Sequence, residues 1–344
     1  MNRSGVPEPD IEYAPKSYVC RRAKEPLVLD GRFDKPFWAE ADWTDEFVDI
    51  EGDRRPLPAK RTRVKMLWDD DYFYFAAEMI EDQIWATLTE RESVIFYDND
   101  FEIFIDPDGD SHQYYEFEIN ALNTVWDLLL VKPYRDGGPP VNGWDINGLR
   151  TAVYIDGELN RPGAANRMWS VEIAMPWSSL RECATEGRPP ESGEFWRVNF
   201  SRVEWRAETE DGAYRKVINP DTGKSYPEDN WVWSPMGLIN MHYPELWGYV
   251  MFAGESGPSS FELPLDERVK WELRKLYYRE RNYFAEHGSF TNDLKSLMRS
   301  GEQWSITPVA ETTRSLFQIS APSVDGKSVF CIREDGKLWK EPAS

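Results

Sequence analysis

The sequence predicts a mainly β fold: a two-sheet antiparallel β-sandwich, followed by a C-terminal appendage of one helix and a β-meander. Runs of alternating apolar and polar residues recur between residues 64 and 201, and they predict strands with one buried face. Turn residues separate these runs, and few helical patterns interrupt them. After residue 265 the apolar residues return at helical spacing, which predicts a separate C-terminal element.

The strand signals begin with a hairpin. Val64, Met66 and Trp68 alternate with polar neighbours, aspartates 69–71 turn the chain, and residues 72–79 return. Successive side chains of a strand point to opposite faces, so each alternating run should place one set of side chains in a core between two sheets. The later runs are 101–105, 115–120, 169–173 and 196–201.

We expect three segments along the chain. Residues 1–26 are polar, carry several prolines and predict an irregular lead-in. Residues 27–253 should form the sandwich, and residues 254–344 the appendage. A Gly- and Ser-rich linker at 254–260 separates the two.

Within the appendage, Asp266 is a suitable cap for a helix that ends near His287. Residues 316–320 and 328–332 then alternate on either side of a turn at Asp325-Gly326. The appendage is also a candidate dimer or partner surface, and the oligomeric state stays open. We expect packing against the sandwich or a partner from an apolar stripe on the helix, made of Val269, Leu273, Leu276, Tyr277 and Phe284.

Charge and aromatic content narrow the ligand classes. The chain of 344 residues has a formal net charge of −21, so its surface should repel nucleic acid and anionic membranes. No run is apolar and long enough to cross a bilayer. Neutral sugars and cations remain as ligands. The 16 Trp, 16 Tyr and 17 Phe suit a large core, and some of them are available to stack on sugar rings.

Cysteine usage and the N-terminus bear on the cellular compartment. Cys20, Cys183 and Cys331 are too few and too far apart for a disulfide framework or a zinc site, so we expect free thiols. Residues 1–24 hold no apolar run of the kind that a secretory signal contains. Two locations therefore stay open: the cytoplasm if this N-terminus is native, and a secreted or periplasmic location if a signal was removed.

The sequence offers little catalytic chemistry. Its three histidines lie in different segments, and neither a GxSxG nor an HExxH pattern occurs. Glu102 and Glu118 fall on strands that should be neighbours. They are either a carboxylate pair that hydrolyses a glycoside, or polar groups on a sheet face that bind ligand hydroxyls or an arginine. We favour the second interpretation and expect no catalytic residue and no required cofactor.

Three alternating carboxylates lie in the turn after the 101–105 run. Asp106, Asp108 and Asp110 offer hard oxygen ligands at a spacing that suits calcium. The bidentate Glu of a calcium-binding helix-loop-helix does not follow them. Two interpretations therefore stay open, a structural calcium site and a solvated turn.

Several segments between residues 27 and 253 together resemble the family 9 carbohydrate-binding modules. This resemblance implies a β-sandwich, sugar binding without catalysis, and bound calcium in some members. The segments that carry it are Leu29-Asp30-Gly31, Val64-Lys65-Met66-Leu67-Trp68-Asp69, Asp100-Phe101-Glu102-Ile103-Phe104-Ile105-Asp106, Phe117-Glu118-Ile119-Asn120, Trp169-Ser170-Val171-Glu172-Ile173 and Trp233-Ser234-Pro235.

The resemblance also implies a place for the sugar site. Two tryptophans that enclose the sugar in the family fall near Phe96 and near the 241–243 segment. A family Glu and Asn match Glu102 and Asn120, while Glu118 stands where the family has Arg. We therefore expect a shallow cleft with a floor of Glu102, Glu118 and Asn120 and a rim of Phe96, Trp144, Met241, His242 and Tyr243. Further candidates in loops or at strand ends are Trp85, Arg91, Trp126 and Trp205.

The function hypotheses come from different classes. The first is non-catalytic binding of a mono- or oligosaccharide. The second is a glycoside-active enzyme that uses Glu102 and Glu118. The third is a haem-binding domain, because distant relatives of this sandwich hold haem b through an axial His or Met.

Overall fold

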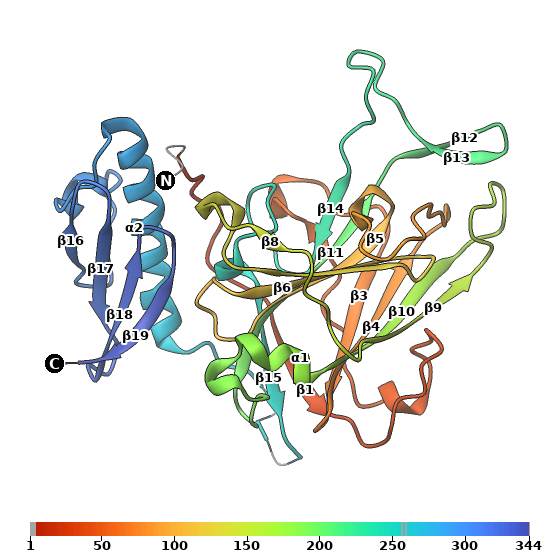
Figure 1. Cartoon of the computed structure of the whole chain (residues 1–344), viewed down its shortest axis with the longest axis horizontal. Helices are drawn as coiled ribbons and strands as arrows, with labels where there is room; N and C mark the ends of the chain where they lie inside the picture. Colours follow the sequence, from red (N-terminus) through yellow and green to blue (C-terminus); the bar gives the residue numbers. More distant parts are fainter. Residues whose placement is uncertain (1–4, 256, 259, 344) are drawn as a thin grey trace.

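The computed structural model describes residues 5–255, 257–258 and 260–343, and its largest part is a β-sandwich of two packed layers (Figure 1). The predicted mainly β fold with a C-terminal helix and sheet is confirmed. One layer holds, in spatial order, β8 (Pro140–Val141), β7 (Val125–Leu130), β6 (Tyr114–Asn120), β5 (Asp100–Asp106), β11 (Phe195–Glu204) and β15 (Gly248–Ala253). The other holds β1 (Ser17–Arg22), β3 (Thr62–Trp68), β4 (Tyr72–Ile80), β10 (Met168–Pro176) and β9 (Arg150–Asp156).

Shorter elements surround these layers. Strand β14 (Asp229–Val232) pairs with β11 and with β2 (Val48–Asp49), and β12 (Ala207–Glu210) forms a separate hairpin with β13 (Ala213–Lys216). One helical turn, α1 (Trp177–Leu180), follows β10. No helix among the described residues is both long and apolar enough to span a membrane.

The core between the layers comes from the alternation in the sequence. In β5, Phe101, Ile103 and Ile105 point inward and are buried. They pack in one cluster with side chains of the opposite layer, such as Phe75 and Ile173. The other side chains of β5 must therefore lie on the outer face of their layer.

Strand β1 corrects the expectation of an irregular segment at 1–26. Its backbone pairs in parallel with β15 on one side and with the end of β3 on the other, so it joins the two layers into one hydrogen-bonded sheet. Tyr18 and Cys20 enter the core, and the Tyr18 hydroxyl donates to the Asp42 carbonyl at 2.7 Å. Pro7, Pro9 and Pro15, which suggested an irregular chain, all precede this strand.

The appendage packs on the sandwich through helix α2 (Leu265–His287), close to the predicted bounds. Asp266 lies in the first helical turn, and Pro264 holds the capping position. Gly288 ends the helix in the left-handed conformation, with φ of 72°. On the side of α2 away from the sandwich lies a four-stranded antiparallel sheet (Figure 1) of β16 (Val309–Thr312), β17 (Phe317–Pro322), β18 (Ser328–Arg333) and β19 (Leu338–Pro342).

The apolar stripe of α2 lies between that sheet and the sandwich. Leu273, Leu276 and Tyr277 are fully buried and share a core cluster with Phe104 of β5 and Ile319 of β17. The expectation that the stripe is buried is confirmed for these residues and for Val269, whereas Phe284 is only partly buried. The predicted linker at 254–260 includes Ser256 and Ser259, which lie outside the described residues.

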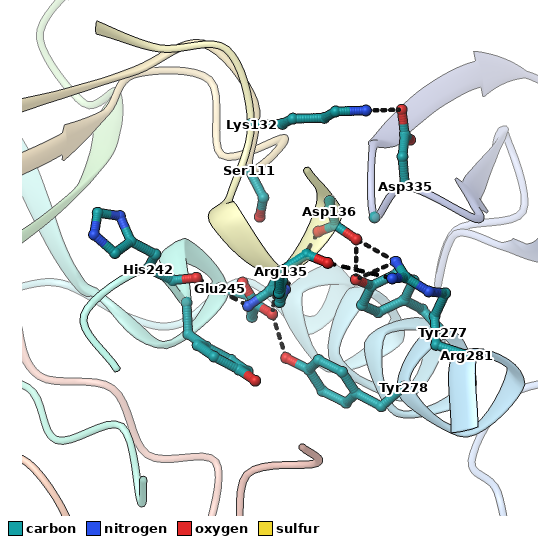
Figure 2. A network of polar contacts seen from close by, with 12 residues as sticks. Ser111, Lys132, Arg135, Asp136, His242, Glu245, Tyr277, Tyr278, Arg281 and Asp335 are labelled. Atoms are coloured by element: carbon teal, nitrogen blue, oxygen red, sulfur yellow. Dashed lines mark hydrogen bonds and ion pairs between the residues drawn. The ribbon is translucent and has the colours of Figure 1, made fainter. Parts of the chain in front are cut away.

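A buried polar network also ties α2 to the sandwich (Figure 2). The guanidinium of Arg135 donates to the carboxylate of Glu245 at 2.7 Å, and the hydroxyl of Tyr278 donates to the same oxygen. Asp136 accepts from the hydroxyl of Tyr277 and pairs with Arg281. The loop after β7 and the turn before β15 are thus joined to the helix by charges that water hardly reaches.

Replacing Arg135 by Ala should lower the free energy of unfolding by about 3–5 kcal/mol, because the buried Glu245 carboxylate would lose its cation. Urea denaturation of the full chain measures this loss. Arg167→Ala is the matched control, since Arg167 pairs with Asp156 on the surface. An equal effect of both substitutions would contradict a stabilising role for the network.

Glu280 of α2 should make stability depend on pH. Burial raises its pKa to about 7, although the Thr291 amide donates to it. Unfolding restores an ordinary pKa near 4.5, so stability falls as pH rises from 4.5 to 7 and stays reduced above 7. Glu280→Gln should therefore stabilise the protein by roughly 1–3 kcal/mol at pH 8 and by almost nothing at pH 4. Thermal unfolding at both pH values tests this, with exposed Glu286→Gln as the control.

Candidate functional site

A cleft of about 370 Å³ lies on the outer face of the layer that contains β5, β6 and β7. Its wall residues come from loops that are far apart in the sequence. The strands contribute Glu102, Phe104, Glu116, Glu118 and Trp126, and the loops contribute Phe96, Tyr134, Glu228, Met241 and His242.

Strand register brings the floor residues into one row. Glu102 of β5 pairs with Glu118 of β6, and Glu118 pairs in turn with Trp126 of β7. Glu116 lies two residues before Glu118, on the same face. The inward neighbours of these residues fill the core, so the polar side chains are left on the outer face.

The floor is acidic and buried. Glu102, Glu116 and Glu118 are all less than a tenth exposed. Burial raises the pKa of Glu102 to about 7. Burial also raises the pKa values of Glu116 and Glu118 well above their usual range, and the negative charge of nearby Glu102 raises them further. Among the described residues that line the cleft, none is Lys or Arg. The floor therefore favours ligands that bring hydrogen-bond donors or positive charge.

One wall is built around Phe96. Its amide donates to the Glu118 carboxylate at 2.9 Å, which fixes the wall to the floor. The indole of Trp205 donates to the Phe96 carbonyl at 2.8 Å. Trp205, a further candidate from the sequence, therefore supports this wall, and it is not among the residues that line the cleft.

The opposite wall contains His242 and Tyr134. Their rings meet edge to face with centroids 4.5 Å apart, and His242 Nδ1 lies 2.9 Å from the Tyr114 hydroxyl. Burial, helped by nearby Arg135, lowers the pKa of His242 to about 3, so the ring is neutral near pH 7. Arg135 also donates to the His242 carbonyl at 3.0 Å, which links this wall to the network at α2 (Figure 2).

The structure brings together most of the residues that the sequence predicted for the cleft. Phe96, Glu102, Glu118, Met241 and His242 line it. The further candidate Trp126 lines it as well.

The expectation that Asn120 belongs to the cleft floor is corrected, because Asn120 stabilises a turn and does not line the cleft. Its amide group donates to the Leu88 carbonyl at 2.9 Å and to Asp98 at 3.0 Å. Its oxygen accepts from the amides of Leu122 and Thr124. Asn120 is the last residue of β6, and its side chain stabilises the turn that connects β6 to β7.

The expectation that Trp144 and Tyr243 form part of the cleft rim is also corrected. The ring of Trp144 stacks on Tyr115, with centroids 4.7 Å apart, and Tyr115 belongs to the core face of β6. Tyr243 is buried beneath the guanidinium of Arg135, and its hydroxyl donates to the Pro7 carbonyl at 3.0 Å. The loop positions of both residues suggested a rim, but tertiary contacts turn them away from the cleft.

The two remaining candidates lie outside the cleft. Trp85 is buried, and Arg91 pairs with Asp127 and with Asp145. The sequence analysis also missed other residues that line the cleft, among them Glu116, Tyr134 and Glu228. Glu116 was detectable from its two-residue spacing to Glu118, whereas Tyr134 and Glu228 come from long loops whose path local patterns do not encode.

The aspartates of the 106–110 turn lie close enough to share a cation. One oxygen from each of Asp106, Asp108 and Asp110 lies within 4.8 Å of the others. Asp106 accepts from the amides of Gly109 and Ser111, so its carboxylate also closes the turn. Calcium at this turn stays a prediction.

The comparison with protein families agrees with the resemblance found in the sequence. Residues 29–132 match the family model described as "Carbohydrate family 9 binding domain-like", which confirms the resemblance over this segment. The segment contains β5, β6 and β7, the strands of the cleft floor. A comparison with curated proteins finds no match.

Solved structures with a similar chain path are distant in sequence. A putative carbohydrate-binding protein from Bacteroides uniformis is 15% identical, with a TM-score of 0.49, over 70% of this chain and 100% of that one. A family 9 module from Caldicellulosiruptor kristjanssonii, in complex with cellotriose, is 15% identical, with a TM-score of 0.44, over 72% and 99%. The glucose complex of a family 9 module from that organism gives the same identity and TM-score, over 72% and 100%.

Replacing Asn120 by Ala should lower stability, not ligand affinity. Four hydrogen bonds around the turn would be lost, and we expect a loss of about 1–3 kcal/mol in the free energy of unfolding. Urea denaturation measures it, with Asn142→Ala in an exposed loop as the control. Unchanged stability would show that Asn120 does not hold the turn.

Proposed function

We propose that this protein binds a carbohydrate, without catalysis, in the cleft above Glu102, Glu116 and Glu118. One observation carries the proposal: the segment that matches the family 9 model contains all three strands of the cleft floor. Under this proposal the ligand is a mono- or oligosaccharide that enters from solvent.

The chemistry of the cleft suits a polyhydroxylated ligand. Sugar hydroxyls both donate and accept hydrogen bonds, and a carboxyl group accepts them when ionised and can also donate one when protonated. Aromatic side chains of Phe96, Trp126 and Tyr134 supply flat apolar surface on which a sugar ring can stack. The glutamates of the floor would form hydrogen bonds with the sugar hydroxyls, and the aromatic residues would orient the sugar ring.

The arrangement of Glu102 and Glu118 favours binding over hydrolysis. Glycoside hydrolases place their two carboxyl groups on either side of the scissile bond. Here the two residues are direct cross-strand neighbours on one floor, so both approach a ligand from the same side.

The cleft also differs from a haem pocket. Met241 and His242 are present as possible axial ligands, but four glutamates line the same space. Haem sites need a deep and largely apolar pocket, and the carboxylates would face the porphyrin. Carbohydrate is therefore the ligand class that we propose.

A glycan array with the full chain tests the proposal, followed by calorimetry on the glycans that bind. Trp126→Ala and Glu102→Gln should each weaken affinity by about tenfold or more, because one removes a stacking surface and the other a carboxyl group of the floor. Trp144→Ala is the matched control and should keep full affinity, since Trp144 stacks on the core face of β6.

Two results would count against the proposal. If no glycan binds the intact chain, carbohydrate is not the ligand. If a glycan binds and both cleft variants keep full affinity, the sugar site lies elsewhere on the protein.

A further inference from the structure

Three carboxylates converge beside the cleft floor: Glu102 and Glu118 line the cleft, and Asp100 is buried next to them. One oxygen from each of Asp100, Glu102 and Glu118 lies within 4.8 Å of the others. Asp100 comes two residues before Glu102 on β5, so both side chains leave the strand on the same face. The three residues are 0%, 5% and 1% exposed, so water cannot solvate their charges well.

The carboxylate of Asp100 has no hydrogen-bond partner within the described part of the chain. Neither of its carboxylate oxygens forms a hydrogen bond of good geometry with a described residue, although the Val203 amide lies nearby and the side chain is completely buried. Neighbouring Asp98 is also buried, but its carboxylate accepts hydrogen bonds from Thr87, Leu88 and Asn120. A buried carboxylate without donors is costly, so Asp100 points to a group that the polypeptide itself does not supply.

The residues that the structure describes also supply no counter-charge to these three carboxylates. Within the described ranges, no Lys or Arg forms an ion pair with Asp100, Glu102 or Glu118. Buried carboxylates elsewhere in the protein do have cations, as Glu204 has Arg202 at 3.0 Å and Lys60 at 2.8 Å. Asp100, Glu102 and Glu118 differ from Glu204 in this respect, although all four are buried.

We propose that Asp100, Glu102 and Glu118 bind a divalent cation, and that Ca²⁺ is the preferred ion. All donors are carboxylate oxygens, which hard cations prefer, and Ca²⁺ accepts six to eight of them in flexible geometry. Three side chains leave coordination positions open toward the cleft. Water fills these positions in the free protein, and neighbouring hydroxyls of a sugar replace it on binding, a step that rests on the proposed function.

The other acidic clusters are less complete candidates. Asp127 accepts from Arg91 and from the Ile146 amide, and Asp145 also pairs with Arg91. The Asp106 carboxylate is used by its own turn. Because these clusters also offer oxygens, the test must separate them from Asp100.

The cation site is tested by calorimetric titration of the EDTA-treated full chain with CaCl₂ alone. We expect Asp100→Asn to weaken Ca²⁺ binding by about tenfold or more, because it removes one charged ligand. Asp108→Asn, in the turn cluster, is the matched control and should leave this binding event unchanged. Asn is isosteric with Asp, and thermal unfolding without metal should show that the Asp100→Asn variant is folded and at least as stable as the wild type.

Two outcomes would overturn the cation site: no uptake of Ca²⁺ by the wild type, or equal uptake by Asp100→Asn. The role of the ion in recognition is tested separately, by titrating a bound glycan with Ca²⁺ present and with EDTA. Loss of glycan binding in EDTA supports the role. Equal glycan binding in EDTA overturns the role of the ion. Binding of glucosamine in EDTA that depends on Asp100 also overturns it, because the ammonium group of the sugar would then occupy the site in place of a metal ion.

The two proposals fail in different ways. Ca²⁺ uptake that depends on Asp100, without any glycan ligand, supports the cation site and contradicts the proposed function. Glycan binding without Ca²⁺ uptake contradicts the cation site and supports the proposed function.

Discussion

The two-residue alternation of β5, β6 and β7, held in one register, is the constraint on which the rest of this structure depends. One set of side chains on these strands must fill the core between the layers, as Phe101, Ile103 and Phe117 do. The alternate set is then forced to the outer face of the same layer. Glu102 and Glu118 meet there because they are paired across the strands, not because they attract each other.

The outer face of this layer has an apolar region and a polar region. Toward one end it carries Phe104, Tyr114 and Leu128, which join the core cluster that contains the buried side of α2. Toward the other end it carries the carboxylates, and there it remains an open cleft. The appendage therefore covers the apolar part of the face and leaves the polar part accessible.

Arg135 lies where these two regions meet. It donates to Glu245, which also accepts from Tyr278 of α2, and to the carbonyl of His242 in the cleft wall (Figure 2). Buried ion pairs of this kind are costly to break because each partner would be left without a counter-charge. The position of one cleft wall is thus coupled to the docking of the C-terminal helix.

The sequence by itself determined the features that depend on local period. Alternation revealed which faces of β5 and β6 are polar, and helical spacing revealed α2 and its buried stripe, because side-chain direction repeats with the backbone geometry. Only the tertiary structure decided which loop residues reach the cleft. Asn120 and Trp144 were predicted for the cleft but serve a turn and the core, and Tyr134 enters it from a long loop. The parallel pairing of β1 was hidden for the same reason: contacts between distant segments are chosen by the packing of the whole chain, and no local pattern encodes them.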